Sequence, residues 1–268
     1  MTCVWVSCDD DSKWFLLLLL PFQAIRGSTG VVNLAGEPIA TRWDAKVKEA
    51  LRTSRLGTTD LIVRMINECP EESRPEVLVS SSAVGFYGTS ETATFDEASP
   101  PGSDFLARLC EDWEQAAYAA KCDRTVVIRT GIVLAKEGGA LAKMLPVFQI
   151  FAGGPLGGGN QWFSWIHRDD LCGIVVMALK DQASFRTGAY NGTAPEPVTM
   201  NQVCAAIGKA LGRPSWMPVP DIALSLLLGE GAMVVLEGQK VLPVATEKAG
   251  YNFRFRTVQE AVNNIVGK

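Results

Sequence analysis

Short apolar runs alternate with long amphipathic stretches from residue 30 onward, and this alternation constrains the fold more than any other feature of the sequence. Runs typical of buried strands occupy residues 31–36, 77–79 and 125–129. Between them, apolar residues recur at helical spacing over 47–66 and 105–117. Because strands and helices alternate, the sequence predicts an α/β fold with a parallel sheet and right-handed crossovers.

The sequence changes character beyond residue 138. Glycines crowd residues 153–159, and an aromatic stretch follows at 162–165. Capping boxes at 199–202 and 257–260 mark the starts of two later helices. We therefore predict a small, mostly helical C-terminal subdomain beside the sheet.

Composition excludes several classes of protein. The chain has 268 residues, 47% of them hydrophobic, so intrinsic disorder is excluded. Its net charge is −4 and it has no stripe of lysine and arginine, which disfavours nucleic acid as a partner.

The single histidine, His167, excludes a metal site that needs two, and no metal is predicted. Seven cysteines without a C-x-x-C pair favour a reducing compartment. The apolar run at 14–25 is too short to cross a bilayer.

Residues 1–26 differ from the rest of the chain. An acidic run at 9–11 precedes the leucines at 16–20, which fits neither a secretory signal nor a plastid transit peptide. The segment is therefore interpreted as a short buried strand or helix, or as a sequence foreign to the fold.

Three serines, Ser80, Ser81 and Ser82, stand at the carboxyl end of the second predicted strand, and Tyr87 follows within a turn. Ligands bind at this edge of open parallel sheets. A hydroxyl there can donate a hydrogen bond to a substrate carbonyl, whereas the alternative is that the serines only stabilise a tight turn.

Five motifs occur together in a collinear order: NLAG at 33–36, SSSAVGFYG at 80–88, RTGIVL at 129–134, WIHRDDL at 165–171 and YNGTAP at 190–195. Together they resemble extended short-chain dehydrogenases/reductases of the NAD-dependent epimerase/dehydratase type. More closely, they are similar to an atypical epimerase family branch, whose bacterial members are labelled SulA-like cell-division inhibitor homologues. Its plant members are plastid proteins, including the giant-chloroplast protein linked to plastid division. The stretches 153–167 and 227–243 look specific to that branch, and the resemblance runs from residue 25 to the end.

The resemblance implies a Rossmann-type sheet with NAD or NADP across its strand ends. Asn33, Leu34, Ala35 and Gly36 would line the cofactor, because a glycine without Cβ lets the backbone approach it closely. Ser80 and Arg129 are predicted at the same edge. For Arg129, an ion pair with a carboxylate is an equal alternative.

Two departures from the family pattern bear on activity. No G-x-x-G-x-x-G phosphate loop precedes NLAG, so the usual N-terminal half is interpreted as missing or replaced by residues 1–26, and cofactor binding is predicted to be impaired. The Tyr-x-x-x-Lys pair of the superfamily falls on Phe105 and Leu109, which cannot relay a proton. The catalytic candidates are therefore Ser81, Ser82 and Tyr87. Three acidic residues near this helix position are predicted to form a solvated face: Glu111, Asp112 and Glu114.

Trp162, Trp165 and His167 are candidates for a substrate-binding loop or lid. The alternative for the tryptophans is a packed contact between subdomains. For His167, the alternative is a hydrogen bond in a turn, with a neighbouring aspartate capping the next helix.

We predict an atypical N-terminal segment at 1–26, a truncated Rossmann-like domain at 27–190 and a C-terminal subdomain at 191–268. Val4–Val6 or Phe15–Leu20 is expected to fill the strand position beside NLAG, because an uncovered edge strand invites aggregation. The resemblance implies a chloroplast protein with plastid-division proteins as possible partners, whereas the missing phosphate loop predicts impaired nucleotide binding. One alternative is an active NAD(P)-dependent oxidoreductase or epimerase acting on a small carbonyl or sugar-nucleotide substrate. Another is a truncated isoform or a misjoined gene model.

Overall fold

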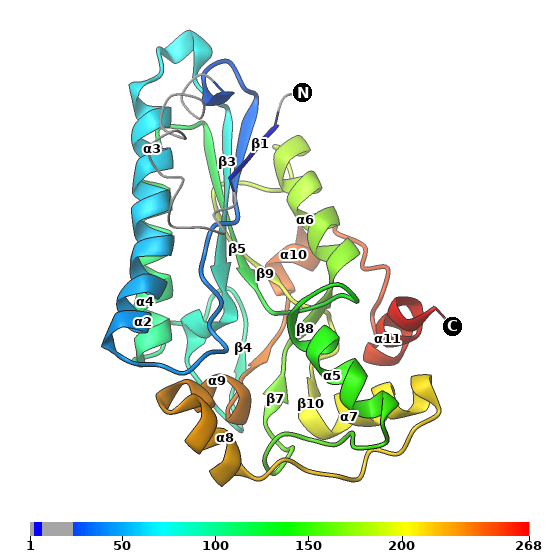
Figure 1. Cartoon of the computed structure of the whole chain (residues 1–268). Helices are drawn as coiled ribbons and strands as arrows, with labels where there is room; N and C mark the ends of the chain where they lie inside the picture. The colour runs from blue at the N-terminus through cyan, green and yellow to red at the C-terminus, as the bar shows by residue number, and fades with distance from the viewer. Residues whose placement is uncertain (1–2, 7–23, 268) are drawn as a thin grey trace.

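A five-stranded parallel sheet organises the computed structural model, which describes residues 3–6 and 24–267 (Figure 1). Its strand order is β1-β2-β3-β5-β9. The strands are β1 (Cys3–Val6), β2 (Gly30–Asn33), β3 (Val77–Ala83), β5 (Arg124–Thr130) and β9 (Gly188–Gly192). Every neighbouring pair is parallel, which confirms the predicted α/β class.

The strand position beside NLAG is occupied by β1. Cys3 to Val6 pair in parallel with Gly30 to Asn33. The prediction that Val4–Val6 supplies a substitute strand is therefore confirmed, whereas the alternative, Phe15–Leu20, lies outside the described residues. This pairing covers the edge of β2, whose Val31 and Val32 are almost completely buried.

Helices cover both faces of the sheet (Figure 1). One face packs against α3 (Thr58–Glu68) and α4 (Phe105–Tyr118), with α2 (Ala45–Arg52) packed on α4, and the other face packs against α6 (Arg168–Lys180). Strand side chains alternate between two cores: Leu78 and Val127 face α3, and Val79 and Val126 face α6.

Two local predictions need correction. The helical pattern over 47–66 is not one regular helix, because a π-helical turn, η1 (Thr53–Gly57), separates α2 from α3. Ser80–Ser82 do not follow the second strand but belong to it, since pairing with β5 continues to Ala83. Tyr87 ends the short 3-10 turn η3 (Val84–Tyr87) that comes next.

The C-terminal subdomain is mostly helical, as predicted. Its helices are α7 (Met200–Leu211), α8 (Asp221–Leu228), α9 (Met233–Leu236), α10 (Val244–Lys248) and α11 (Val258–Val266). Helix α5 (Gly139–Gln149) precedes the subdomain in the chain but packs with it. Both predicted capping boxes form, at Thr199 with Gln202 and at Thr257 with Glu260. Helices α5, α7 and α11 share a core in which Phe148 is almost completely buried.

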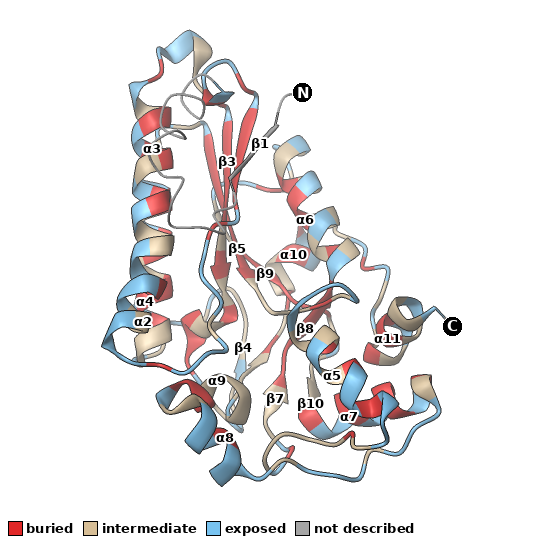
Figure 2. Cartoon of the chain, viewed as in Figure 1, coloured by how far each residue is buried: buried red, intermediate tan, exposed pale blue. Residues whose placement is uncertain are grey.

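Three two-stranded pairs lie outside the five-stranded sheet. They are β4 (Thr94–Phe95) with β11 (Lys240–Val241), β6 (Ile132–Leu134) with β8 (Trp165–His167), and β7 (Trp162–Phe163) with β10 (Val198–Thr199). Buried residues concentrate in the central strands, whereas α8 is largely exposed (Figure 2). Among the described residues, no helix is long and apolar enough to cross a membrane.

Candidate functional site

Most of the predicted site residues share the carboxyl edge of the parallel sheet. Asn33 lies level with Ser80 on β3, and Ser82 lies level with Arg129 on β5. Arg129 is in turn level with Asn191 on β9. The register therefore brings the predicted edge residues together, because parallel strands end at the same side of a sheet.

Asn33 and Ser80 are fully buried and fix the shape of this edge. The Asn33 Nδ2 donates to Thr59 Oγ1 at 2.8 Å and lies 3.5 Å from Ser80 Oγ. The Asn33 Oδ1 accepts from the backbone N–H of Ala35 at 3.2 Å. These contacts hold the segment after β2 in place, and Leu34 is exposed there.

Gly36 lies directly against the guanidinium of Arg55. A Cβ at position 36 would be 3.2 Å from Arg55 Cζ, so a larger side chain would crowd the cation. Arg55 donates to the carbonyls of Leu51 at 3.1 Å and Glu37 at 2.9 Å, and its Cζ lies 5.3 Å from the Trp113 ring centre. Burial lowers the pKa of Arg55, with nearby charges opposing the shift. These partners leave guanidinium N–H groups available at the strand end.

Sequence analysis missed Arg55, because one arginine within an amphipathic helical pattern carries no signal. The π turn at Thr53–Gly57 contains this residue. Such a turn shifts the phase of a helix by inserting an extra residue, and π turns are frequent at functional sites. The side chain thereby reaches a sheet edge that periodicity alone does not indicate.

A buried ion pair joins α4 to β5. The Glu114 carboxylate accepts two hydrogen bonds from Arg129, at 2.8 Å to Nε and 2.9 Å to Nη2. Glu114 is only 5% exposed, so its predicted place on a solvated face is wrong. The alternative interpretation of Arg129, a structural ion pair, is the arrangement that the structure contains. Asp112, by contrast, pairs on the surface with Arg52.

The hydroxyls of Ser82 and Tyr87 belong to the same buried network. Ser82 Oγ donates to Glu114 at 2.7 Å. Tyr87 Oη accepts from Arg129 Nη1 at 3.0 Å and donates to Asn191 Oδ1 at 2.7 Å. Burial raises the pKa of Tyr87 to about 12, although Arg129 opposes the shift. Both hydroxyls therefore have intramolecular partners, and the Tyr87 phenol is kept neutral.

Ser81 has a different environment from its two neighbours. Successive strand residues face opposite sides of a sheet, so Ser81 lies on the face away from Ser80 and Ser82. It is half-buried, whereas Ser80 and Ser82 are buried. Among the predicted catalytic hydroxyls, Ser81 is thus the most accessible to a ligand.

Apolar side chains occupy the positions of the expected tyrosine–lysine pair on α4. Phe105 packs edge-on against Trp43, with ring centres 5.5 Å apart, and Leu109 is 2% exposed in the same cluster. Lys48 Nζ lies 5.5 Å from the Phe105 ring centre but belongs to α2. The helix that would present a proton relay therefore presents a packed hydrophobic contact.

Trp162 and Trp165 lie on strands β7 and β8, outside the parallel sheet. Trp165 is completely buried and its Nε1 donates to the Glu196 carbonyl at 3.0 Å. Trp162 is half-buried, donates to the Glu91 carbonyl at 2.8 Å, and has Lys240 Nζ 4.9 Å from its ring centre. The packed-contact alternative fits Trp165, while Trp162 keeps an accessible face.

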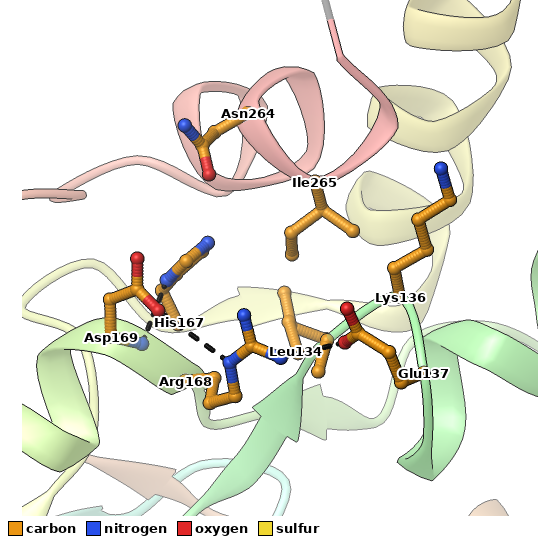
Figure 3. A pocket seen from close by; sticks show the side chains of 9 residues that line it. Leu134, Lys136, Glu137, His167, Arg168, Asp169, Asn264 and Ile265 are labelled. Carbon is orange, nitrogen blue, oxygen red and sulfur yellow. Dashed lines mark hydrogen bonds and ion pairs between the residues drawn. The ribbon is translucent and has the colours of Figure 1, made fainter.

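His167 caps helix α6 beside a shallow pocket of about 130 Å³ (Figure 3). Its Nδ1 accepts from the backbone N–H of Asp169 at 3.0 Å. The side chain is only 3% exposed, and burial lowers its pKa despite Asp169 and Asp170. Arg168 at the pocket rim is paired with Glu137 at 2.7 Å. His167 therefore stabilises the start of the helix, a structural role but not the hydrogen bond in a turn that was expected.

The helix is capped by His167 itself, so the expected aspartate cap needs correction. Asp170 instead fixes the chain after α10: its carboxylate accepts from Tyr251 Oη at 3.0 Å and from the backbone N–H groups of Arg254 and Phe255 at 2.9 and 3.1 Å. No cluster of three or more metal-binding side chains occurs within residues 3–6 and 24–267.

Comparison with known families is consistent with this geometry. Residues 21–191 match the NAD dependent epimerase/dehydratase family. The chain belongs to this family. Residues 219–265 match a domain of unknown function, which covers α8 to α11.

Individual relatives place the chain more closely. It is 55% identical over 245 residues to the chloroplastic homologue of epimerase family protein SDR39U1 from Arabidopsis thaliana, covering 91% of this chain and 70% of that protein. It is 41% identical to SDR39U1 from Mus musculus, covering 88% of this chain and 81% of the relative. The crystal structure of human SDR39U1 isoform 2 with NADPH aligns with a TM-score of 0.84 at 37% identity, covering 90% of this chain and 82% of that one. This member of the epimerase family is therefore SDR39U1-like.

Proposed function

We propose that this epimerase family member binds NADP(H), or NAD(H), along the carboxyl edge of its parallel sheet. The observation that carries the proposal is the approach of Gly36 to Arg55, which leaves exposed backbone and a cation side by side. An arginine fork suits the phosphate oxygens of a dinucleotide. The human relative solved with NADPH supports the choice of cofactor.

Binding is proposed to be weak. Gly27–Gly30 is only G-x-x-G and directly precedes the NLAG strand, so it does not stand in for the longer glycine-rich loop with which the family holds the pyrophosphate. Backbone N–H donors of that loop normally contribute much of the phosphate recognition. Leu34, Gly36 and Arg55 would then carry most of the contact, while Asn33, Ala35 and Ser80 would shape the edge from below.

The bound cofactor would supply hydride transfer, and Ser81 is the residue proposed to orient a substrate carbonyl by donating a hydrogen bond. Ser82 and Tyr87 would act as positioning residues, because their hydroxyls are bonded to Glu114, Arg129 and Asn191. No tyrosine–lysine relay supports a conventional reaction on α4. We therefore propose slow turnover or none.

An active oxidoreductase or epimerase is the second candidate, and the half-buried Ser81 favours it. Its substrate would be a small carbonyl compound or a sugar nucleotide, as the family resemblance implies. Turnover that is lost in Ser81→Ala but retained in Ser90→Ala would establish this candidate, because the half-buried Ser90 hydroxyl only accepts from the backbone N–H groups of Thr92 and Ala93.

Location in the chloroplast is proposed from the similarity to the chloroplastic Arabidopsis protein. A role with plastid-division proteins stays a prediction that rests on the resemblance alone. The interpretation as a truncated isoform or misjoined gene model also stays a prediction, and sequencing of transcripts across the codons for residues 20–30 tests it.

Titration of the purified full chain with NADPH and NADH tests the proposed cofactor site. We expect measurable binding that Arg55→Met weakens by roughly tenfold or more, because a hydrogen bond to a charged group is lost. Arg52→Met is the matched control, since Arg52 lies one turn earlier and pairs on the surface with Asp112.

Thermal unfolding of each variant ensures that folded samples are compared. Arg55→Lys keeps the charge and should retain part of the affinity. Absence of binding by the folded wild type at millimolar cofactor, or an equal effect of Arg52→Met and Arg55→Met, would contradict the proposed site.

A further inference from the structure

A group of exposed apolar side chains surrounds the end of α5 and the linker between α7 and α8, which runs along the lower end of the molecule (Figures 1 and 2). The members are between 41% and 73% exposed: Val147, Ile150, Phe151, Trp216 and Met217. Large apolar side chains that gather at one place on a surface mark an interaction site.

Direct contacts join the two segments into one surface. Trp216 Nε1 donates to the Phe151 carbonyl at 3.1 Å, and the Trp216 backbone N–H donates to the Gly153 carbonyl at 3.0 Å. The Arg213 guanidinium lies 4.2 Å from the Phe151 ring centre. The aromatic residues of the helix end and of the linker are therefore held side by side.

Phe151 has an unusual backbone conformation for an exposed aromatic residue. Its φ is 65°, and it is the one residue other than glycine with positive φ among those described. The left-handed region is unfavourable for a bulky side chain, and strained residues concentrate at functional positions. Since Phe151 is 52% exposed, folding gains little from its burial in return.

The charges around these residues have one sign. Lys143 lies one helical turn before Val147, and Lys209 lies one turn before Arg213, and all three cations are exposed. None of them takes part in an ion pair between described residues. Residues 138–168 and 197–220 contain no aspartate or glutamate, although the whole chain carries a net charge of −4.

We propose that this basic aromatic face, Lys143, Val147, Ile150, Phe151, Lys209, Arg213, Trp216 and Met217, docks on an anionic membrane surface. Tryptophan and phenylalanine favour the boundary between lipid headgroups and acyl chains, and lysine and arginine are attracted to anionic headgroups. The combination of exposed aromatic residues with unpaired cations fits this partner better than it fits a second copy of the acidic chain.

Co-sedimentation of the full chain with lipid vesicles tests the proposal. We expect binding to vesicles of phosphatidylcholine with phosphatidylglycerol, weaker binding to phosphatidylcholine alone, and loss of binding at high salt. A Lys143→Gln, Lys209→Gln, Arg213→Gln variant should bind roughly 100-fold more weakly, because each cation contributes separately. Trp216→Ser with Ile150→Ser should also weaken binding, and both changes affect exposed positions that folding tolerates.

Helix α8 offers a matched control. Ile222 and Leu226 are 75% and 72% exposed, but this helix is bounded by the acids Asp221 and Glu230. Ile222→Ser with Leu226→Ser should leave vesicle binding unchanged. Absence of vesicle binding, equal binding to neutral vesicles, or equal loss in the α8 control would overturn the proposal. A dimer in sedimentation velocity that Trp216→Ser dissociates would assign the face to a second copy instead.

Discussion

The Glu114–Arg129 pair lies at the centre of a buried hydrogen-bond network of the site. Its carboxylate accepts from Arg129 twice and from Ser82 once, and both charged side chains are at most 7% exposed. A buried charge that loses its partner is costly, because water cannot replace the partner. The pair therefore fixes the positions of Ser82 and Tyr87.

We expect Glu114→Gln to lower the free energy of unfolding by about 3–5 kcal/mol, since it leaves Arg129 buried without its counter-ion. Urea denaturation measures the change. Asp112→Asn on the same helix breaks an exposed pair with Arg52 and should cost less than about 1 kcal/mol. A loss in Glu114→Gln as small as the loss in Asp112→Asn would show that the buried pair contributes no more to stability than the exposed pair.

His167 gives the fold a sensitivity to acid. Burial lowers its pKa below the ordinary 6.5, so the unfolded chain binds a proton more readily than the folded chain does. The contribution of His167 to the free energy of unfolding is therefore fully present above pH 6.5 and is lost as the pH falls toward the lowered pKa. Protonation of Nδ1 would also remove the acceptor for the Asp169 N–H.

His167→Asn tests this, because asparagine caps helices but does not titrate. The free energy of unfolding of the wild type should fall as the pH drops below 6.5, and the variant should show a smaller decline. The measurement is urea denaturation across this range, and parallel curves for both proteins would contradict the assignment.

At the scale of single elements, capping was the most accurate local prediction. The box at Thr199 and Gln202 forms because both hydrogen bonds join residues only three apart, at 2.7 and 3.4 Å. Such contacts depend little on the rest of the fold. The π turn before α3 was not predictable, since its extra residue depends on how α2 and α3 pack on their neighbours.

Thr199→Ala should destabilise the protein by about 1 kcal/mol through loss of the α7 cap, whereas Thr199→Ser should retain most of that contribution. Thermal unfolding of the two variants measures the difference. A serine variant as unstable as the alanine variant would show that the methyl group of Thr199, not its hydroxyl, stabilises the helix start.

At the scale of the whole molecule, two buried cysteine thiols make the stability of the fold depend on pH in the alkaline range. Burial raises the pKa values of Cys110 and Cys204 from 9.0 to about 12, and Glu114 adds to the shift of Cys110. The folded state therefore keeps these thiols protonated after the unfolded chain has lost its protons. The contribution of these two thiols to the free energy of unfolding is fully present below pH 9 and is lost as the pH rises toward 12.

Cys204→Ala should reduce the slope of stability against pH above 9, although its cavity lowers stability at every pH. Urea denaturation at neutral and alkaline pH separates the two effects, because the cavity contributes a constant offset. An unchanged slope would show that this thiol ionises without unfolding.

The sequence by itself determined the parallel α/β class, the alternation of strands and helices over residues 31–129 and the two capping boxes, since periodicity and capping are local. Its motifs also placed Asn33, Ser80–Ser82 and Arg129 at one edge, because parallel strands all end on the same side. The need to cover β2 predicted a substitute strand at Val4–Val6 or Phe15–Leu20, and the structure places that strand at Cys3–Val6. Only the tertiary structure decided that Glu114 is buried, that Arg55 reaches Gly36 and that Ser81 is more accessible than its neighbours. Those facts depend on contacts between residues far apart in the chain, which no local pattern records.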